Sequence, residues 1–428
     1  MEKNSYLRLL SIGIVIILAL PMAQDFFGIW KEAPLKGAFE EKEAVEWSKE
    51  GWLTGTYQEA TGEYLRQQFG GSTWAVRWHN QYLYSLLGMA TNTNLVLGKD
   101  NYIFEKVYLD EIEGKNYSGQ EYLQTIAEQL AFIQQQMAQK GQLLITVLAP
   151  NKARYYPDYL PEGVEIEEDT TNYHILKQKL ANHQVNVLDV EAWFMEARDT
   201  TTYPLFPPYG THWSVYGVAL FVDSLLGYIE DKTNRPTAEL VWDSLWTSSR
   251  LQDPDNDLEE LLNVAFYLPA TPMPYYKAHF RMNEQTFKPR LLAIGDSFWG
   301  TYGFRYHLSR DCFNQPEYWY YYKTRFPGGE PRTEADRALF DQQEVIVIEV
   351  TTANIPHFGW GALDGLRNHY NTADDIYVKE MEAKIRADEE WFKAIVAKAK
   401  ERGLTVDEMV TLDAEYMVEQ QLKARLAQ

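Results

Sequence analysis

Four short apolar runs, separated by helical segments, constrain the fold of this 428-residue chain more than any other feature. The runs cover residues 143–148, 185–190, 290–294 and 345–350, and a segment with helical spacing at 121–139 precedes the first. Nearly continuous apolar strands that alternate with helices are typical of a parallel sheet buried on both faces. We therefore predict an α/β fold, a three-layer α/β/α sandwich, with its chemistry beyond the carboxyl ends of the strands.

An apolar segment near the N-terminus predicts where the chain is located. Lys3 and Arg8 precede an uncharged run at 9–24, and further apolar residues follow at 26–30. This length fits a membrane-spanning helix when the flanking residues extend it, and the positive charges before it place residues 31–428 outside the cytoplasm. A cleaved signal peptide is the alternative. Its cleavage site would lack the required small residue, so we favour an uncleaved anchor.

The charge balance excludes some functions. The chain has 40 Lys and Arg against 61 Asp and Glu, a formal net charge of −21, so it lacks the attraction to phosphate backbones that nucleic-acid binding needs.

Its single cysteine, Cys312, allows no intrachain disulfide. The sequence has no C-x-x-C, no histidine pair at metal-ligand spacing and no glycine-rich phosphate loop, so we expect no metal and no nucleotide cofactor. The acidic patch at 253–260 is interpreted as a solvated loop and helix start.

The pattern along the chain predicts four parts. They are an N-terminal anchor or signal peptide (1–30), a helical N-terminal region (31–95), an α/β catalytic domain (96–365) and a C-terminal helical segment (366–428). Residues 73–89 carry apolar side chains at helical spacing, a stripe that we expect to pack in the core. A helix at 375–402 is expected to stop at Gly403, and 405–408 resembles the start of another.

Two motifs carry the chemistry. Gly295-Asp296-Ser297-Phe298 follows an apolar strand directly, and a serine on such a turn gains from backbone N–H donors that can stabilise an oxyanion. His212, in the segment 209–217, lies just before an apolar helix and could be the base that activates Ser297. The alternative for both motifs is structural, with Asp296 or Ser297 capping one helix and His212 packing at the start of the other.

Together, T-H-W-S-x-Y-G followed by G-D-S-F resembles the SGNH-hydrolase-like domain of the alginate O-acetylation proteins, the AlgX/AlgJ group. Segments 98–104, 149–152 and 349–354 also resemble the family pattern, so the resemblance covers roughly residues 50–360. His212 precedes Ser297, as in the permuted arrangement of this group. The resemblance implies a Ser-His-Asp triad in which Ser297 takes up an acetyl group and His212 is its general base.

One position departs from the family pattern. The triad aspartate of the family lies two residues before the histidine, where this chain has Gly210. Three possibilities follow: a backbone carbonyl orients His212, another carboxylate replaces the aspartate, or the domain binds glycan without turnover. The carboxylates considered are those of Asp189 and Glu349 and, as a weaker choice, that of Asp296.

The remaining site residues are assigned more loosely. We expect the backbone N–H of Ser297, on the turn that Gly295 permits, to be one oxyanion donor. A loop glycine or asparagine is expected to be the second, and Asn354 is the candidate. Tyr302 either lines the site or packs in the core, and Lys152 either contacts an anionic sugar or pairs with a carboxylate. The aromatic run at 318–322 is interpreted as a strand rather than as a sugar platform.

These observations predict an extracytoplasmic O-acetyltransferase, periplasmic and anchored to the inner membrane, that modifies a cell-surface polysaccharide through an acetyl-serine intermediate. The resemblance implies that a membrane-bound O-acyltransferase partner supplies the acetyl group. The alternatives are an acetyl esterase with water as acceptor and a non-catalytic glycan-binding or scaffold subunit of an export complex. The acidic composition disfavours a polyanionic glycan and widens the candidates to neutral polymers.

Overall fold

The computed structural model describes residues 2–29, 31–37, 42–300, 311–326, 328–371 and 375–426. Of the residues named above, Tyr302 and the end of the apolar stretch at 26–30 lie outside the described residues. The strands are β1 (Leu95–Leu97), β2 (Ile103–Glu105), β3 (Leu143–Ala149), β4 (Val187–Asp189), β5 (Glu239–Ser248), β6 (Met273–Arg281), β7 (Arg290–Gly295), β8 (Asn314–Tyr320), β9 (Thr324–Phe326), β10 (Glu330–Pro331) and β11 (Val345–Thr351). The α-helices are α1 (Glu2–Phe27), α2 (Lys49–Thr54), α3 (Thr56–Gln68), α4 (Ser72–Leu87), α5 (Lys106–Ile112), α6 (Gln120–Gln139), α7 (Lys152–Tyr155), α8 (Asn172–Asn182), α9 (Val190–Ala197), α10 (Val215–Thr233), α11 (Asp257–Leu262), α12 (Ser297–Trp299), α14 (Ala362–Asn371), α15 (Asp375–Ala387), α16 (Glu389–Arg402) and α17 (Val406–Leu426). Short 3₁₀ segments are η1 (Lys99–Asn101), η2 (Pro157–Tyr159), η4 (Glu334–Gln342) and η5 (Thr352–Gly361).

The central sheet is mostly parallel, as predicted. Its strand order is β10-β9-β8-β7-β11-β3-β4, in which β8, β7, β11, β3 and β4 pair in parallel and β9 and β10 add an antiparallel edge. The carboxyl ends of β7 and β11 lie beside each other, so Ser297 and the residues after β11 come from neighbouring strands. This edge is where a parallel sheet places its chemistry.

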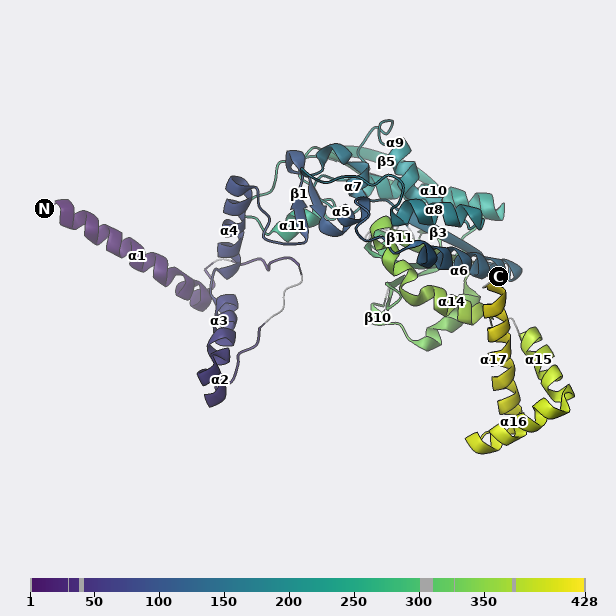
Figure 1. Cartoon of the computed structure of the whole chain (residues 1–428). Coiled ribbons are helices and arrows are strands. Elements are labelled where there is room, and N and C mark those ends of the chain that lie inside the picture. The colour runs from purple at the N-terminus through teal and green to yellow at the C-terminus, as the bar shows by residue number, and fades with distance from the viewer. Residues whose placement is uncertain are drawn as a thin grey trace.

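Helices cover both faces of the sheet, which confirms the three-layer sandwich (Figure 1). Alternate residues of β3 supply each face: Ile145 and Val147 belong to the core shared with α10, whereas Leu144 and Leu148 belong to the core shared with α6, α8 and α14. Both sets are at most 1% exposed, because a strand buried on both faces needs apolar side chains at every position. The four apolar runs of the sequence follow from this burial.

Three of the four predicted strands lie where the sequence places them, as β3, β7 and β11. The fourth prediction, 185–190, is wrong at both ends, because β4 begins at Val187 and α9 already begins at Val190. Asp189 caps that helix, and its Oδ1 accepts a hydrogen bond from the backbone N–H of Ala192 at 3.0 Å. The long antiparallel pair β5–β6, a separate two-stranded sheet, was not predicted.

The aromatic run at 318–322 is only partly a strand. Its first three residues end β8, and the chain then turns at Tyr321 and Tyr322, whose φ angles are 50° and 57°. The strand prediction is therefore confirmed for Tyr318 to Tyr320 alone.

The N-terminal region is helical, but it does not form a core. Helices α2 and α3 bury no side chain, and α4 buries only Asn80. The expectation of a core stripe at 73–89 is therefore wrong. Leu83 is half-buried, and the other apolar side chains of the predicted stripe are 37–69% exposed: Trp74, Val76, Trp78, Tyr82, Leu86 and Leu87.

Within the described residues, one helix is long and apolar enough to cross a membrane, the segment Tyr6–Phe27 of α1. Its mean hydropathy is 2.1, and the segment is not buried in the protein. Figure 1 shows α1 projecting away from the rest of the molecule, with α3 and α4 at its inner end.

The C-terminal helices α15, α16 and α17 share a small core of their own. The helix predicted at 375–402 is broken at Asp388, whose carboxylate caps α16 by accepting from the backbone N–H groups of Glu390 and Trp391. The predicted stop at Gly403 and the cap at Thr405 are confirmed, because Gly403 has φ 67° and the Thr405 hydroxyl accepts from the Glu408 N–H. Helix α14 spans position 365, the predicted border of the catalytic domain, and packs on α6.

Candidate active site

Ser297 lies on the sharp turn between β7 and α12. The carboxylate of Asp296 caps α12, since its Oδ1 accepts from the backbone N–H of Phe298 at 3.0 Å. The Tyr318 hydroxyl holds the same turn from β8 by donating to the Asp296 carbonyl at 2.6 Å. Gly295 is required because a Cβ at this position would collide with the carboxylate of Glu349 on β11. The turn is thus fixed from both neighbouring strands, and it carries the hydroxyl at the edge of the sheet.

The structure brings His212 and Ser297 together. Nε2 of His212 lies 2.9 Å from Ser297 Oγ, although 85 residues separate the two along the chain. His212 precedes α10, whose N-cap Ser214 accepts from the Gly217 N–H, and its ring lies against Phe298 with 4.9 Å between ring centroids. This distance is within the reach that a base needs to take the proton of a hydroxyl.

A carboxylate that the sequence analysis did not consider completes the arrangement. Oδ2 of Asp257, the first residue of α11, lies 2.7 Å from Nδ1 of His212. Because a carboxylate can only accept, Nδ1 carries the hydrogen and Nε2 keeps its lone pair toward Ser297. The second oxygen, Asp257 Oδ1, accepts from the backbone N–H of Thr211 at 2.8 Å, which fixes the carboxylate beside the ring.

The loop that carries Asp257 explains the glycine at position 210. A Cβ on Gly210 would lie 2.6 Å from Cγ of Pro207 and 3.0 Å from the carbonyl oxygens of Pro254 and Asp255. The loop before α11 therefore occupies the space that a side chain at this position would need. The same loop is tied to the histidine segment in the other direction, because the N–H of Leu258 donates to the Tyr209 carbonyl at 2.9 Å. In this chain the acid reaches His212 from α11 and not from the histidine's own segment.

Neighbouring charges set the protonation of His212. Burial alone lowers the pKa of His212. The hydrogen bond and charge of Asp257 raise it, the charges of Glu105 and Asp296 raise it further, and together they outweigh the effect of burial. The net result is a raised pKa, which means that the imidazolium formed during proton transfer is stabilised in place. The Thr211 hydroxyl donates to Glu105, so this additional carboxylate is itself held in position.

None of the three carboxylates proposed from the sequence orients His212. Asp189 caps α9, accepts from the Tyr173 hydroxyl and pairs with Lys177 at 2.8 Å. Glu349 is fully buried beneath the Ser297 turn, where Oε2 accepts from the Asp296 N–H at 3.1 Å. Burial and the Asp296 charge raise the pKa of Glu349 well above its usual range, which favours the neutral acid.

Asp296 faces β11 rather than His212. Its Oδ2 accepts from the N–H and hydroxyl of Thr351 at 3.0 and 2.8 Å and from Nδ2 of Asn354 at 2.8 Å. Asn354 is thus held beside the residue preceding the nucleophile, and its role as an oxyanion donor stays a prediction. Strand-end position suggested these carboxylates, but their own partners turn them away from the imidazole.

Lys152 does not face a substrate. It is 1% exposed, and Nζ donates to the backbone carbonyls of Ile103, Pro208 and Gly210 at 2.7, 2.8 and 2.8 Å. Within the described residues Lys152 makes no side-chain ion pair, and its burial excludes a sugar contact, so both expectations for this residue are wrong. Burial lowers the pKa of Lys152 to about 7, although Asp257 and Glu105 oppose this. Its ammonium fixes the backbone that leads into His212.

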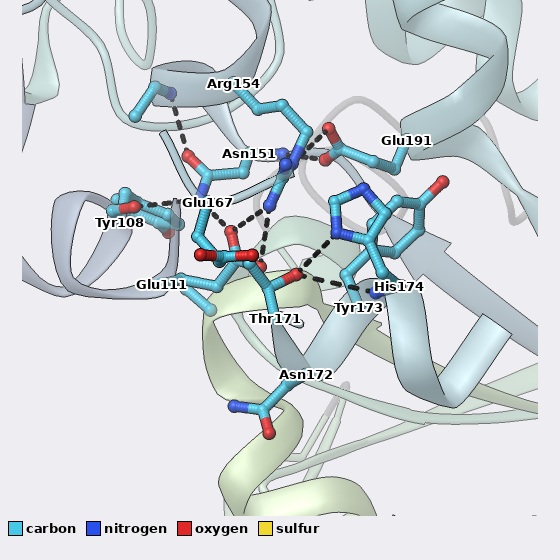
Figure 2. Close-up of polar contacts among 12 residues, drawn as sticks. Tyr108, Glu111, Asn151, Arg154, Glu167, Thr171, Asn172, Tyr173, His174 and Glu191 are labelled. Carbon is cyan, nitrogen blue, oxygen red and sulfur yellow. Dashed lines mark hydrogen bonds and ion pairs between the residues drawn. The ribbon is translucent and has the colours of Figure 1, made fainter. Parts of the chain in front are cut away.

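A buried polar cluster supports the turn on which Lys152 lies (Figure 2). Arg154 donates to both oxygens of Glu111 at 2.9 and 3.0 Å, and its Nε lies 3.4 Å from Glu191. The Asn151 side chain caps α7 and also donates to Glu111, while its N–H donates to Glu191 at 2.5 Å. Burial raises the pKa of Glu191 to about 8. The end of β3 is therefore held by side chains at most 9% exposed.

A cavity of about 330 Å³ opens on Ser297 and His212. Its lining residues are Lys36, Gly37, Glu105, Thr211, His212, Asp257, Leu258, Glu260, Leu261 and Ser297. Three carboxylates and one lysine line it, and Lys36 pairs with Glu260 at 3.0 Å. The linker that follows α1 thus forms one wall of the pocket.

Comparison with known proteins decides the family. The family model of the SGNH hydrolase-like domain of acetyltransferase AlgX matches residues 95–312, just over half of the chain. The chain belongs to this family. The resemblance drawn from the two motifs is confirmed, and the matched range of this AlgX-family chain contains His212, Asp257 and Ser297.

Solved structures similar to this AlgX-family chain include three named proteins. The O-acetyltransferase domain of AlgJ from Pseudomonas putida is 19% identical, and the match covers 64% of this chain and 99% of that one at a TM-score of 0.41. AlgX from Pseudomonas aeruginosa is 15% identical, with 68% and 71% covered at 0.41. PatB1 from Bacillus cereus is 10% identical, with 61% and 97% covered at 0.38. No curated protein sequence matches the chain.

Sequence reasoning selected Ser297 and His212, which the structure places 2.9 Å apart, but it missed Asp257, Glu105 and Lys36. The signal for Asp257 was present, because Gly210 left a carboxylate missing and the acidic patch at 253–260 runs into the short helix α11. That patch was interpreted as a solvated loop and helix start, and only the helix start is confirmed. Most of its residues are in fact buried or half-buried, and the Asp257 side chain is only 23% exposed.

Proposed function

We propose that this protein is an O-acetyltransferase that works through an acetyl group on Ser297. The observation that carries the proposal is the relay from Asp257 through His212 to Ser297, at 2.7 and 2.9 Å. Membership of an acetyltransferase family supports the proposal that the transferred group is an acetyl group. The non-catalytic alternative depended on the missing carboxylate at Gly210, and Asp257 removes that reason for it.

The geometry supports a two-step transfer. Ser297 Oγ attacks the carbonyl carbon of an acetyl ester while His212 Nε2 takes the hydroxyl proton, and the donor alcohol leaves with that proton. An acceptor hydroxyl then gives its proton to His212 and attacks the acetyl-serine, and the proton returns to Ser297 as the new ester leaves. The backbone N–H of Ser297, at the start of α12, is the proposed donor to the oxyanion.

The pocket lining supports a neutral acceptor. Glu105, Asp257 and Glu260 bring carboxylates to the cavity, whereas Lys36 is already paired. A uronate polymer would be repelled there, so the acceptor is a neutral cell-surface polysaccharide. The apolar helix α1 is the proposed anchor to the inner membrane, with the catalytic domain on its extracytoplasmic side and the acetyl group supplied by a membrane-bound O-acyltransferase.

A direct experiment separates transfer from hydrolysis. The full-length protein in detergent is given a soluble acetyl ester, with and without neutral oligosaccharides, and the products are followed by mass spectrometry. Acetylated sugar, together with an intact-protein mass increase of one acetyl group that is absent in Ser297→Ala, is the expected result. Free acetate with no acetylated sugar for any acceptor would assign the protein as an esterase. Equal turnover by Ser297→Ala would reject the nucleophile.

A further inference from the structure

One face of α4 leaves large apolar side chains about half exposed in the described part of the chain. Trp74, Trp78, Tyr82 and Leu86 recur every four residues and therefore lie along one side of the helix, with exposed fractions of 57, 42, 56 and 69%. We call these four residues the aromatic stripe. The exposed Phe266 extends it, since its ring centroid lies 5.1 Å from that of Trp78. Patches of this kind on a folded protein mark an interaction surface.

The opposite face of α4 is held by polar contacts, so the stripe has a fixed direction. Asn80 Nδ2 donates to the Leu262 carbonyl at the end of α11, and the Tyr84 hydroxyl donates to Asn101. Asn80 and Tyr84 lie about half a turn around the helix from the stripe. Because α11 begins with Asp257, the helix that presents the stripe is directly braced against the helix that carries the catalytic acid.

The outer end of α1 is tied to the same helix. Glu32, just after α1, accepts from Gln24 within α1 at 3.2 Å and from the Gly71 N–H and Thr73 hydroxyl at the start of α4, at 2.6 and 2.9 Å. A Cβ at Gly70 would collide with the backbone of Pro21 in α1, which shows how closely the α3–α4 junction approaches it. The stripe therefore begins where α1 would leave the hydrocarbon layer.

The charge of α4 differs from that of the rest of the chain. The chain as a whole carries −21, yet α4 contains no Asp or Glu, and its basic residues are Arg77 and His79. Arg77 donates to the carbonyls of Ala33 and Pro34 in the linker at 3.0 and 2.8 Å. An acidic helix would be repelled by anionic headgroups, whereas this one is not. Tryptophan and tyrosine are also the residues that settle at the boundary between headgroups and acyl chains.

We propose that the aromatic stripe of α4 docks in the interfacial layer of the bilayer that α1 crosses, an inference that rests on the proposed anchoring by α1. The occupant of the face is lipid, because the stripe is continuous with the outer end of a membrane-spanning helix and has no acidic residue. Docking fixes the catalytic domain relative to the membrane. Since Lys36 and Gly37 of the same linker line the catalytic cavity, the pocket is held close to the bilayer surface from which its acetyl donor comes.

Spin labels on the full-length protein test this directly. The natural Cys312 is buried, so single cysteines can be added and labelled selectively. The stripe is probed with Trp78→Cys and Leu86→Cys, the anchor with Ile16→Cys, and the control is Val396→Cys on α16, which matches Trp78 in exposure at 41% against 42%. Each protein is reconstituted into vesicles of phosphatidylethanolamine and phosphatidylglycerol, and collisions with oxygen and with a water-soluble nickel chelate are measured.

The expected result is a loss of nickel collisions and a gain of oxygen collisions at Trp78 and Leu86, intermediate between the anchor label and the Val396 control. Nickel access at the stripe equal to that of Val396, with Ile16 still shielded, would overturn the docking while leaving the anchor in place. Access at all three positions would overturn both. Shielding of the stripe that needs a partner protein in the vesicle would also overturn it, because the occupant would then be protein.

Discussion

The orienting role of Asp257 predicts a large and specific effect of Asp257→Asn. The amide oxygen of the asparagine would take over the bond from the Thr211 N–H, which leaves its NH₂ group facing His212 Nδ1. Two donors cannot face each other, so the imidazole changes tautomer and carries its hydrogen on Nε2. It can then no longer accept the proton of Ser297.

The magnitude follows from the same geometry. Loss of the correct tautomer in the serine-protease template lowers kcat about 10⁴-fold, which corresponds to about 5 kcal/mol in the activation free energy. The pKa of His212 also falls, because Asp257 is what raises it against burial. Since the base works only when neutral, the acid limb of the pH–rate profile moves to lower pH in the variant.

The assay is the hydrolysis of a soluble acetyl ester by full-length protein, from pH 5 to 9. Asp243→Asn is the matched control, because this aspartate also contacts a histidine, His279, but lies on the exposed hairpin β5–β6. The control should keep the wild-type rate and pH profile. A rate for Asp257→Asn within tenfold of wild type, or an unmoved acid limb, would refute the reasoning.

Three further predictions concern the support of the site. Gly210→Ala lowers the free energy of unfolding by about 1–3 kcal/mol, measured by thermal denaturation, because its Cβ would lie 2.6 Å from Pro207; an unchanged midpoint would contradict this. Lys152→Met removes the buried donor to the carbonyls of Ile103, Pro208 and Gly210, of which Pro208 keeps its bond from the Ile103 N–H, and lowers stability by about 3 kcal/mol, with a fall in kcat larger than any change in KM; full activity would exclude its positioning role. Burial raises the pKa of Glu191 from 4.5 to about 8, so between these values the folded state holds a proton that the unfolded state has lost, and stability falls with rising pH by up to about 1.4 kcal/mol per unit. The free energy of unfolding of Glu191→Gln, measured in urea, should fall less steeply with pH than that of the wild type, by the same amount. If the two proteins show the same pH dependence, Glu191 is not protonated in the folded state.

Much of the fold could be predicted because the deciding signals are local. A strand buried on both faces needs an uninterrupted apolar run, so β3, β7 and β11 were evident from the sequence. The strand predicted at 185–190 does not include Val190, because Asp189 caps α9 and starts a helix there. A cap is a signal of only one or two residues, which an apolar run conceals. The stripe on α4 was misjudged for a different reason: helical spacing shows that one face is apolar but not what covers that face.

The sequence by itself determined the family and indicated the proposed nucleophile and base. Ser297 and His212 each lie in a short motif at the end of a strand or the start of a helix, where backbone geometry and chemistry are fixed by adjacent residues. Only the tertiary structure showed which carboxylate contacts His212. Asp257 lies 45 residues beyond His212, and its selection depends on a loop that packs against Gly210 and fills the space where a side chain would stand. The same holds for Lys152, whose sequence context shows a charge but whose burial turns it inward to three carbonyls. Spatial exclusion and burial arise from segments far apart in the chain, so no local pattern encodes them.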